Sequence, residues 1–263
     1  MPVKDGDELI VFRGVHKAFG PKVVYRGLDL EVLKGETLTI LGGSGVGKSV
    51  MLKMLIGLLG TDRGEVWFDG DKVNDMSSSQ LARLRQRVGM VFQSGALFDS
   101  ISVGENVAYG LREHYAHAMS ERDITERVSW ALTSVGMPGI EPMRPSDLSG
   151  GMRKRVGVAR TIALQPEVIL FDEPTTGLDP VNVTRMNHLI VKLKKQLKVT
   201  SIVVTHDMAT AFSVSDRLAF VYKGQIAEKG TKDHFKHTTN PVVQDFVEGR
   251  SPDDDDLAAL LSS

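Results

Sequence analysis

The segment TLTILGGSGVGKSVMLKMLIGLL, Thr37 to Leu59, decides the fold of this chain. It starts with a short apolar run, passes through four glycines and ends in a helical pattern from Val50. The part from Gly42 to Ser49, GGSGVGKS, matches G-x-x-x-x-G-K-[ST] between a strand and a helix, the context that a phosphate-binding loop needs. Glycines let successive N–H groups turn toward a polyphosphate, and the new helix adds its positive N-terminal end.

The last residues of this loop have predicted roles. Lys48 is the point charge for the β- and γ-phosphates, and the hydroxyl of Ser49 is a ligand for Mg²⁺. A glycine-rich turn could merely join a strand to a helix, but Lys-Ser at the correct offset argues against that alternative. We therefore predict ATP and Mg²⁺ as cofactors, with the nucleotide bound by Gly42, Gly43, Ser44, Gly45, Val46, Gly47, Lys48, Ser49 and Val50.

The second motif, VILFDE, is acidic at its end and runs from Val168 to Glu173. It is an apolar strand that ends in two carboxylates, so Asp172 can reach the Mg²⁺ sphere while Glu173 polarises the attacking water. Alone, an acidic pair at a strand end would indicate surface solvation. Together with the phosphate-binding loop, it predicts nucleotide hydrolysis.

The stretch DLSGGMRKRVGVARTIAL begins at Asp147, and its Ser149 is a predicted helix N-cap. Gly150 and Gly151 follow, which leaves backbone N–H groups that an anion could use. By itself this pattern indicates only the start of a helix.

Composition narrows the class of protein. The chain has 263 residues, enough for one large α/β domain with an inserted subdomain. Its formal net charge of -1 gives no field that would attract nucleic acid, so we expect no nucleic-acid partner. It has no cysteine, which fits a reducing compartment and favours the cytosol. No stretch resembles a signal peptide or a membrane span, so another chain would hold it at a membrane.

The order of apolar runs predicts the architecture. Runs without alternation, such as VILF and SIVV, indicate strands buried in a mostly parallel sheet, with helical patterns between them. The strands from Leu9 to Leu41 follow one another without a long helix, which predicts an added antiparallel sheet. We expect four segments: residues 1–92, the first part of the ATP-binding core with the antiparallel β subdomain; 93–151, a helical subdomain; 152–248, the second part of the core; and 249–263, an acidic tail.

The chain resembles the ABC ATPase family from about Leu9 to Gly230, on the phosphate-binding loop, the VILFDE strand and the LSGG sequence together. The resemblance implies a P-loop NTPase core of the RecA-like type. It also implies a head-to-tail dimer with a second copy, in which Ser149, Gly150 and Gly151 of one protomer cover the γ-phosphate bound by the other. A dimer of membrane-embedded permease subunits is the further partner that this family implies.

The same resemblance assigns roles outside the loop. Gln93 looks like the glutamine that contacts Mg²⁺ and the attacking water, and His206 like the histidine that binds the γ-phosphate. With Lys48 and Glu173 they form the predicted catalytic set, and Ser49, Gln93 and Asp172 the metal ligands. Asp179 looks like the aspartate that links the two sites, although alone it would be a helix N-cap. Phe19 resembles the aromatic ring that stacks on adenine; a core phenylalanine near a turn is the alternative.

One signature residue departs from the family. Met152 stands where glutamine is usual, which puts a ribose or cross-protomer polar contact in doubt and leaves the phosphate contacts in place. FQSGALF from Phe92, NVAYGLREH from Asn106 and LSGGM are similar to ATPases of MCE-type lipid transporters. This resemblance implies MCE-domain subunits and, in some systems, a STAS-domain protein as partners, with the GALF segment under a permease coupling helix. An apolar corner within the helical subdomain is the alternative for GALF.

These patterns predict an ATP-hydrolysing motor subunit of an ABC transporter, peripheral on the cytoplasmic face of the inner membrane through its permease, and most similar to lipid-transport ATPases. A transporter of another substrate, a non-transport assembly factor or regulator, and a scaffold that binds ATP without turnover are the alternatives. The tail, with Asp253 to Asp256 before LAALL, is either a short helix that docks on the other protomer or a disordered end.

Overall fold

The computed structural model describes residues 8–115 and 117–248, which form two sheets and a group of helices. The first sheet is antiparallel, in the order β2-β1-β4-β5. Its strands are β1 (Glu8–Phe19), β2 (Lys22–Leu33), β4 (Arg63–Phe68) and β5 (Asp71–Lys72). The predicted antiparallel sheet is therefore present at the start of the chain.

The second sheet has six strands in the order β10-β9-β3-β8-β7-β6. Five of them are parallel, and β10 pairs antiparallel to β9 at one edge. Every residue of β3, β7 and β8 is buried, which is why their sequences show no polar alternation. The strands are β3 (Thr37–Leu41), β6 (Val88–Val91), β7 (Val168–Asp172), β8 (Thr200–Thr205), β9 (Arg217–Tyr222) and β10 (Gln225–Thr231).

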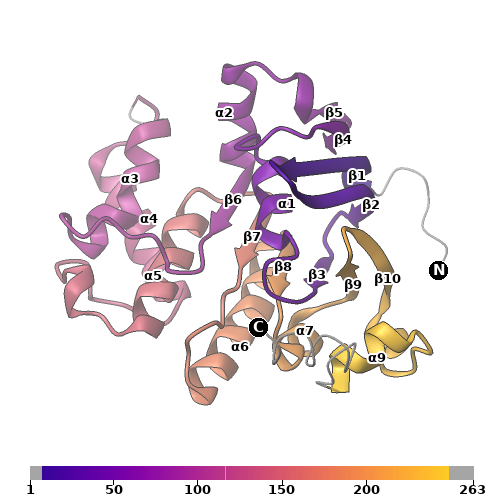
Figure 1. Cartoon of the computed structure of the whole chain (residues 1–263). Coiled ribbons are helices and arrows are strands. Elements are labelled where there is room, and N and C mark those ends of the chain that lie inside the picture. The colour runs from indigo at the N-terminus through magenta and orange to yellow at the C-terminus, as the bar shows by residue number, and fades with distance from the viewer. Residues whose placement is uncertain (1–7, 116, 249–263) are drawn as a thin grey trace.

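Helices cover this sheet. A separate group of helices, α3, α4 and α5, lies on one side of it, away from the antiparallel sheet (Figure 1). Each helix of the described residues is too short or too polar to cross a membrane. The α-helices are α1 (Lys48–Leu55), α2 (Ser78–Arg87), α3 (Val103–Tyr115), α4 (Glu121–Ser134), α5 (Gly150–Ala163), α6 (Pro180–Leu197), α7 (Met208–Val214), α8 (Lys232–Lys236) and α9 (Pro241–Glu248); the 3-10 turns are η1 (Val73–Asp75) and η2 (Pro145–Asp147).

The central sheet separates two hydrophobic cores, as the alternate residues of β7 show. Val168 and Leu170 belong to the core shared with the antiparallel sheet and α1. Ile169 and Phe171 belong to the core shared with α3, α4, α5 and α6. The fold is therefore the predicted α/β core with an antiparallel sheet and added helices, and its strands end at the surface where the phosphate-binding loop lies.

Two expectations are corrected by these bounds. The antiparallel sheet does not extend to Leu41, because β3 pairs in parallel with β8 and β9. The first helix ends at Leu55 instead of Leu59, because Gly57 adopts a left-handed conformation with φ 63°. The N–H of Leu58 then donates to the carbonyl of Lys53, which closes the helix in a Schellman turn.

The segment boundaries remain predictions. The structure bears on two of them, the boundary after residue 151 and the start of the tail at residue 249. The expected boundary between residues 151 and 152 falls inside α5, which starts at Gly150 and packs against both α3 and α4. The proposed tail, residues 249–263, lies outside the described residues, and so does the docking helix that we expected there.

Candidate active site

The phosphate-binding loop joins β3 to α1 in a backbone shape that needs glycine. Gly42, Gly45 and Gly47 have φ values of 155°, 75° and 108°. A Cβ on Gly42 would lie 2.8 Å from the carbonyl oxygen of Val221, so this glycine is also required for space. The loop therefore closes tightly before α1, whose first turn leaves unpaired N–H groups at its start.

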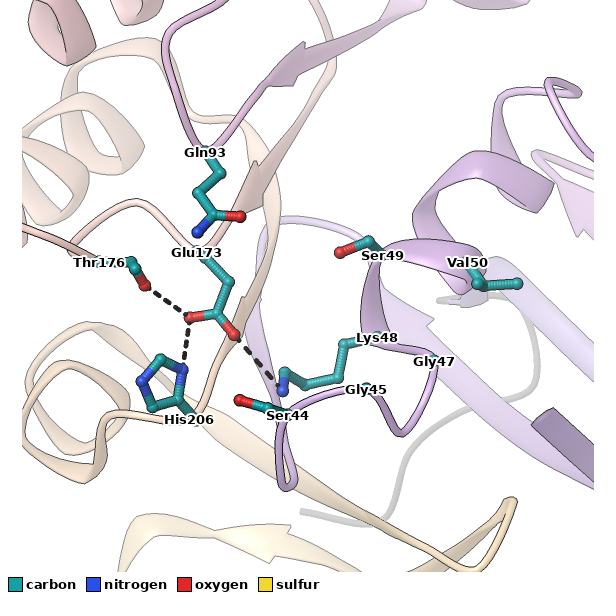
Figure 2. A pocket seen from close by; sticks show the side chains of 10 residues that line it. All are labelled: Ser44, Gly45, Gly47, Lys48, Ser49, Val50, Gln93, Glu173, Thr176 and His206. Carbon is teal, nitrogen blue, oxygen red and sulfur yellow. Dashed lines mark hydrogen bonds and ion pairs between the residues drawn. The ribbon is translucent and has the colours of Figure 1, made fainter. Parts of the chain in front are cut away.

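A cavity of about 360 Å³ opens above this loop (Figure 2). Its walls come from the loop, from the segment after β6, from the turn after β7 and from the end of β8. The lining residues are Ser44, Gly45, Gly47, Lys48, Ser49, Val50, Gln93, Glu173, Thr176 and His206. Because the carboxyl ends of parallel strands meet at one edge of a sheet, residues that are far apart in sequence converge here.

Glu173 is the centre of the polar contacts in this cavity. Figure 2 shows its carboxylate between the side chains of Lys48 and His206. One oxygen lies 3.4 Å from the ammonium of Lys48, and the other lies 3.0 Å from Nδ1 of His206. The hydroxyl of Thr176 donates to that second oxygen at 3.1 Å. The backbone of Glu173 has φ 48°, an unusual value that the surrounding contacts must hold in place.

Lys48 is almost fully buried at the floor of the cavity. Its ammonium donates to the carbonyl oxygens of Gly42 at 2.8 Å and Gly43 at 2.9 Å, besides its contact with Glu173. Burial lowers the pKa of Lys48, while the negative charge of Glu173 opposes that shift. The ammonium is thus positioned beside the loop, where a polyphosphate would meet it.

Asp172 and Ser49 form a second polar pair next to the cavity. The hydroxyl of Ser49 donates to the Asp172 carboxylate at 2.6 Å. Burial raises the pKa of Asp172, the Ser49 hydrogen bond opposes the rise, and the nearby charge of Glu173 adds to it. A hydroxyl and a carboxylate held together in this way are hard oxygen ligands of the kind that Mg²⁺ takes, so these two residues fit the predicted metal.

Nine of the predicted site residues therefore meet in one cavity, whereas Gly42 and Gly43 do not line it. Gln93, Glu173 and His206 line the same cavity as the loop residues. Val46 lines a neighbouring hollow of about 430 Å³, which shares Gly45 with the cavity. Lys22 also lines that hollow and pairs across the β1–β2 hairpin with Phe19, a residue that is 46% exposed.

The signature residues are elsewhere, at the start of α5. Ser149 caps this helix by accepting a hydrogen bond from the N–H of Met152 at 3.3 Å. A Cβ on Gly151 would lie 3.4 Å from the side chain of Asn182 in α6. Asn182 in turn donates to the carboxylate of Asp179, the N-cap of α6. Ser149, Gly150, Gly151 and Asp179 are thus near one another and are absent from the lining of the cavity around Lys48.

Two site residues were not predicted from the sequence, Thr176 and Lys154. Lys154 is buried, and its ammonium donates to three carbonyl oxygens, those of Glu173 at 3.3 Å, Pro174 at 3.1 Å and Thr176 at 2.7 Å. Burial lowers its pKa. The helical period could have indicated that Lys154 is buried, though not what it contacts, because Gly151, Lys154 and Val158 share the buried face of α5.

Comparisons with known proteins agree with this geometry. Residues 25–176 match the family described as "ABC transporter". "Protein TRIGALACTOSYLDIACYLGLYCEROL 3, chloroplastic" of Arabidopsis thaliana is 43% identical over 93% of this chain and 75% of its own length. "Intermembrane phospholipid transport system ATP-binding protein MlaF" of Haemophilus influenzae is 40% identical over 88% and 87%. "Probable ribonucleotide transport ATP-binding protein mkl" of Mycobacterium tuberculosis is 39% identical over 92% and 67%.

Solved structures agree as well. The ATP-binding cassette MJ0796, in a dimeric post-hydrolysis state with ADP and Pi, superposes with a TM-score of 0.78 at 30% identity, covering 85% of this chain and 98% of that one. CbiO1 from Clostridium perfringens, part of the ABC transporter complex cbiONQ, has a TM-score of 0.80 at 29% identity, covering 91% and 95%.

Proposed function

This chain belongs to the ABC transporter family and is an ATPase of that family, and from that premise we propose that it drives phospholipid transport. The cavity in which Glu173 lies between Lys48 and His206, directly above the phosphate-binding loop, supports the ATP-driven part of this proposal. The relatives named for intermembrane phospholipid transport, at 37 to 40% identity, supply the class of substrate.

We propose that the triphosphate of ATP lies over residues 42–50, with the ammonium of Lys48 beside the β- and γ-phosphates. Ser49 and Asp172 would hold Mg²⁺, since they already pair through oxygen atoms, and the side-chain oxygen of Gln93 would complete the protein ligands. When bound, the ion neutralises charge on the phosphate oxygens. Phe19 would contact adenine, because it stands exposed beside Lys22 at the neighbouring hollow.

Glu173 would position the attacking water and accept its proton. Thr176 and His206 both contact one carboxylate oxygen, which fixes the direction of the carboxylate in the cavity. His206 is half exposed and also lines the cavity, so its imidazole would lie beside the γ-phosphate while its Nδ1 contacts Glu173. The protein's contribution is thus to orient water and stabilise charge, which is the main requirement of phosphoryl transfer.

The complete site would need a second copy of this chain. Ser149, Gly150 and Gly151 present the N-terminal end of α5 but are not part of the cavity around Lys48. A head-to-tail dimer would bring the α5 end of one protomer over the phosphates bound by the other, with Asp179 at the junction. The dimeric state of the related MJ0796 cassette supports this arrangement.

The surface around Phe98 is the proposed contact with the permease. Phe98 is 44% exposed and Tyr109 is 49% exposed, and their rings lie 4.9 Å apart. The buried side chain of Asn106 fixes this loop, since it accepts from the N–H of Phe98 at 2.8 Å and donates to its carbonyl at 3.0 Å. Leu97 packs into the helical core instead, so the GALF segment contributes both to that core and to the exposed surface.

Through this permease the chain would sit on the cytoplasmic face of the inner membrane, with MCE-domain subunits and in some systems a STAS-domain protein in the same complex. Purification from detergent extract through a tag on this chain tests the proposal. We expect a multi-spanning permease, an MCE-domain protein and bound phospholipid, together with ATP hydrolysis. Recovery without any multi-spanning protein would favour a non-transport ATPase, and a complex that carries another solute, such as a ribonucleotide, would contradict the lipid assignment.

A single substitution tests whether Phe98 contacts the permease. Phe98→Ser should reduce recovery of the permease severalfold while the purified chain still binds ATP, because the exposed ring contributes apolar contact area. Leu58→Ser is the matched control, since Leu58 is 51% exposed but follows α1 in another part of the chain. Equal permease recovery with the two variants would remove Phe98 from the interface.

A further inference from the structure

A hydroxyl group from the antiparallel sheet reaches the phosphate-binding loop. Tyr25 lies on β2 and is fully buried in the core that this sheet shares with α1. Its hydroxyl donates a hydrogen bond of 2.6 Å to the carbonyl oxygen of Gly47, the last residue before α1. The two residues are 22 positions apart, so the contact joins two separate elements of the fold.

The orientation of the Gly47 carbonyl determines where the next N–H points. In a planar trans peptide the C=O and the following N–H point in opposite directions. The Gly47 carbonyl faces into α1, because it also accepts from the N–H groups of Val50 at 2.8 Å and Met51 at 3.2 Å. The N–H of Lys48 therefore points out of the start of the helix, toward the cavity where an anion would bind.

Three donors share the Gly47 carbonyl oxygen, and the hydroxyl of Tyr25 makes the shortest of the three hydrogen bonds and the only one that comes from outside α1 and its first turn. Gly47 has φ 108° and no Cβ to limit its torsions, so the orientation of the Gly47–Lys48 peptide depends on the hydrogen bonds that its carbonyl accepts. Burial raises the pKa of Tyr25 far above its usual value, so the hydroxyl keeps its proton and remains a donor at neutral pH. The contact is also close-packed, since a Cβ on Gly47 would lie 3.1 Å from the Tyr25 oxygen.

We propose that Tyr25 is a positioning residue for nucleotide binding: its hydroxyl fixes the Gly47–Lys48 peptide so that the Lys48 N–H faces the phosphates. The proposal rests on the assignment of ATP to this cavity. Tyr25 does not line the cavity, so it acts through the loop without touching the ligand. The antiparallel sheet then contributes to phosphate binding through one buried hydrogen bond.

Tyr25→Phe tests the proposal because it removes only the hydroxyl. We expect the dissociation constants of ATP and ADP, and the KM for ATP, to rise between about two- and tenfold, the range that one net hydrogen bond gives, with kcat within about twofold of the parent. Tyr115→Phe is the matched control, because Tyr115 is a partly buried tyrosine of the helical core. It should bind both nucleotides like the parent.

Amide hydrogen exchange supplies the second measurement. In nucleotide-free Tyr25→Phe, the peptide that covers residues 42–52 should exchange faster than in the parent, while other peptides of the same core stay protected. Unchanged nucleotide affinity together with a lowered melting temperature would assign Tyr25 a purely structural role and overturn the proposal. Failure of the parent chain to bind ATP would instead overturn the assignment of the cavity, so the two failures are distinguishable.

Discussion

The ammonium of Lys48 lies 3.4 Å from the carboxylate of Glu173, inside the cavity that faces the phosphate-binding loop. The same carboxylate is held on its other side by Thr176 and His206. A polyphosphate that binds here would therefore compete with the Glu173 carboxylate for the ammonium of Lys48. The phosphates and the Glu173 carboxylate would repel each other, so we expect the residue proposed to orient the water also to weaken nucleotide binding before hydrolysis.

Glu173→Gln separates these two effects. The amide keeps the size of the side chain but removes its charge and its ability to accept a proton, so kcat should fall by about 10²- to 10⁴-fold. Nucleotide should bind at least as tightly as to the parent, because the repulsion is gone. Phosphate release and equilibrium binding of a fluorescent ATP analogue measure the two quantities. Turnover near that of the parent would exclude Glu173 as the base.

Asp172→Asn probes the buried carboxylate beside Ser49. The folded state raises the pKa of Asp172 above its ordinary value near 3.8, chiefly by burial. As pH rises from that value through the raised pKa, the unfolded chain has already lost the proton that the folded chain keeps, so stability falls and the cost persists at neutral pH. The asparagine variant without nucleotide should therefore melt higher at pH 7, by about 2–4 °C for each kcal/mol recovered.

Calorimetry over a range of pH checks this sign. The advantage of the asparagine variant should shrink as pH falls toward 4, because the parent carboxyl then becomes neutral as well. The stabilisation that Mg²⁺ and ATP together give the parent should be largely lost in the variant, because a neutral amide is a poorer ligand for the ion. A variant that melts lower at pH 7 and still gains the full stabilisation would contradict both the cost of the charge and the metal role.

Gly47→Ala tests the shape of the loop. The new Cβ would overlap the side chain of Val24 and meet the ring of Tyr25, and φ 108° is unfavourable for alanine. We expect nucleotide binding to become undetectable and the melting temperature to fall. Gly35→Ala is the matched control for backbone strain alone, because Gly35 has φ 79° with no atom within 4 Å of a built Cβ. Its binding constant should match that of the parent, and equal defects in both variants would assign the loss to strain.

Local sequence patterns predicted the strands and the loop whose conformation depends on residues close to one another in the sequence. The runs TLTIL, VILFD and TSIVVT were recognisable as buried strands because all but one residue of VILFD and of TSIVVT, and every residue of TLTIL, is apolar or β-branched. The loop from Gly42 to Ser49 indicated its own conformation through its glycines. By contrast, β10 has the sequence QIAEKGT, polar on one face and at the sheet edge, so its pairing with β9 was not evident.

The contacts that complete the site could not be predicted in the same way. Tyr25 and Gly47 are 22 residues apart, and Lys154 lies 22 residues before Thr176. Their hydrogen bonds exist only because the sheets and α5 place them together, and no local period specifies that placement. The roles of Gln93 and His206 came from family resemblance, and the structure adds that both line the cavity with Glu173.

Lys154 gives the last prediction, because its buried ammonium joins α5 to the turn that carries Glu173. In Lys154→Met the carbonyl oxygens of Glu173, Pro174 and Thr176 lose their donor, and the φ of 48° at Glu173 loses part of its support. We expect kcat to fall about tenfold or more, while the KM for ATP changes little because Lys154 does not line the cavity.

Lys154→Arg is the conservative partner of this experiment, since a guanidinium can also donate to several carbonyl oxygens. It should recover a large part of kcat and of the melting temperature. Steady-state kinetics and thermal melting of both variants, measured in the complete transporter, distinguish a positioning role from a structural one. If methionine lowers the melting temperature while kcat stays at the parent value, Lys154 stabilises the fold without holding Glu173 in its working position.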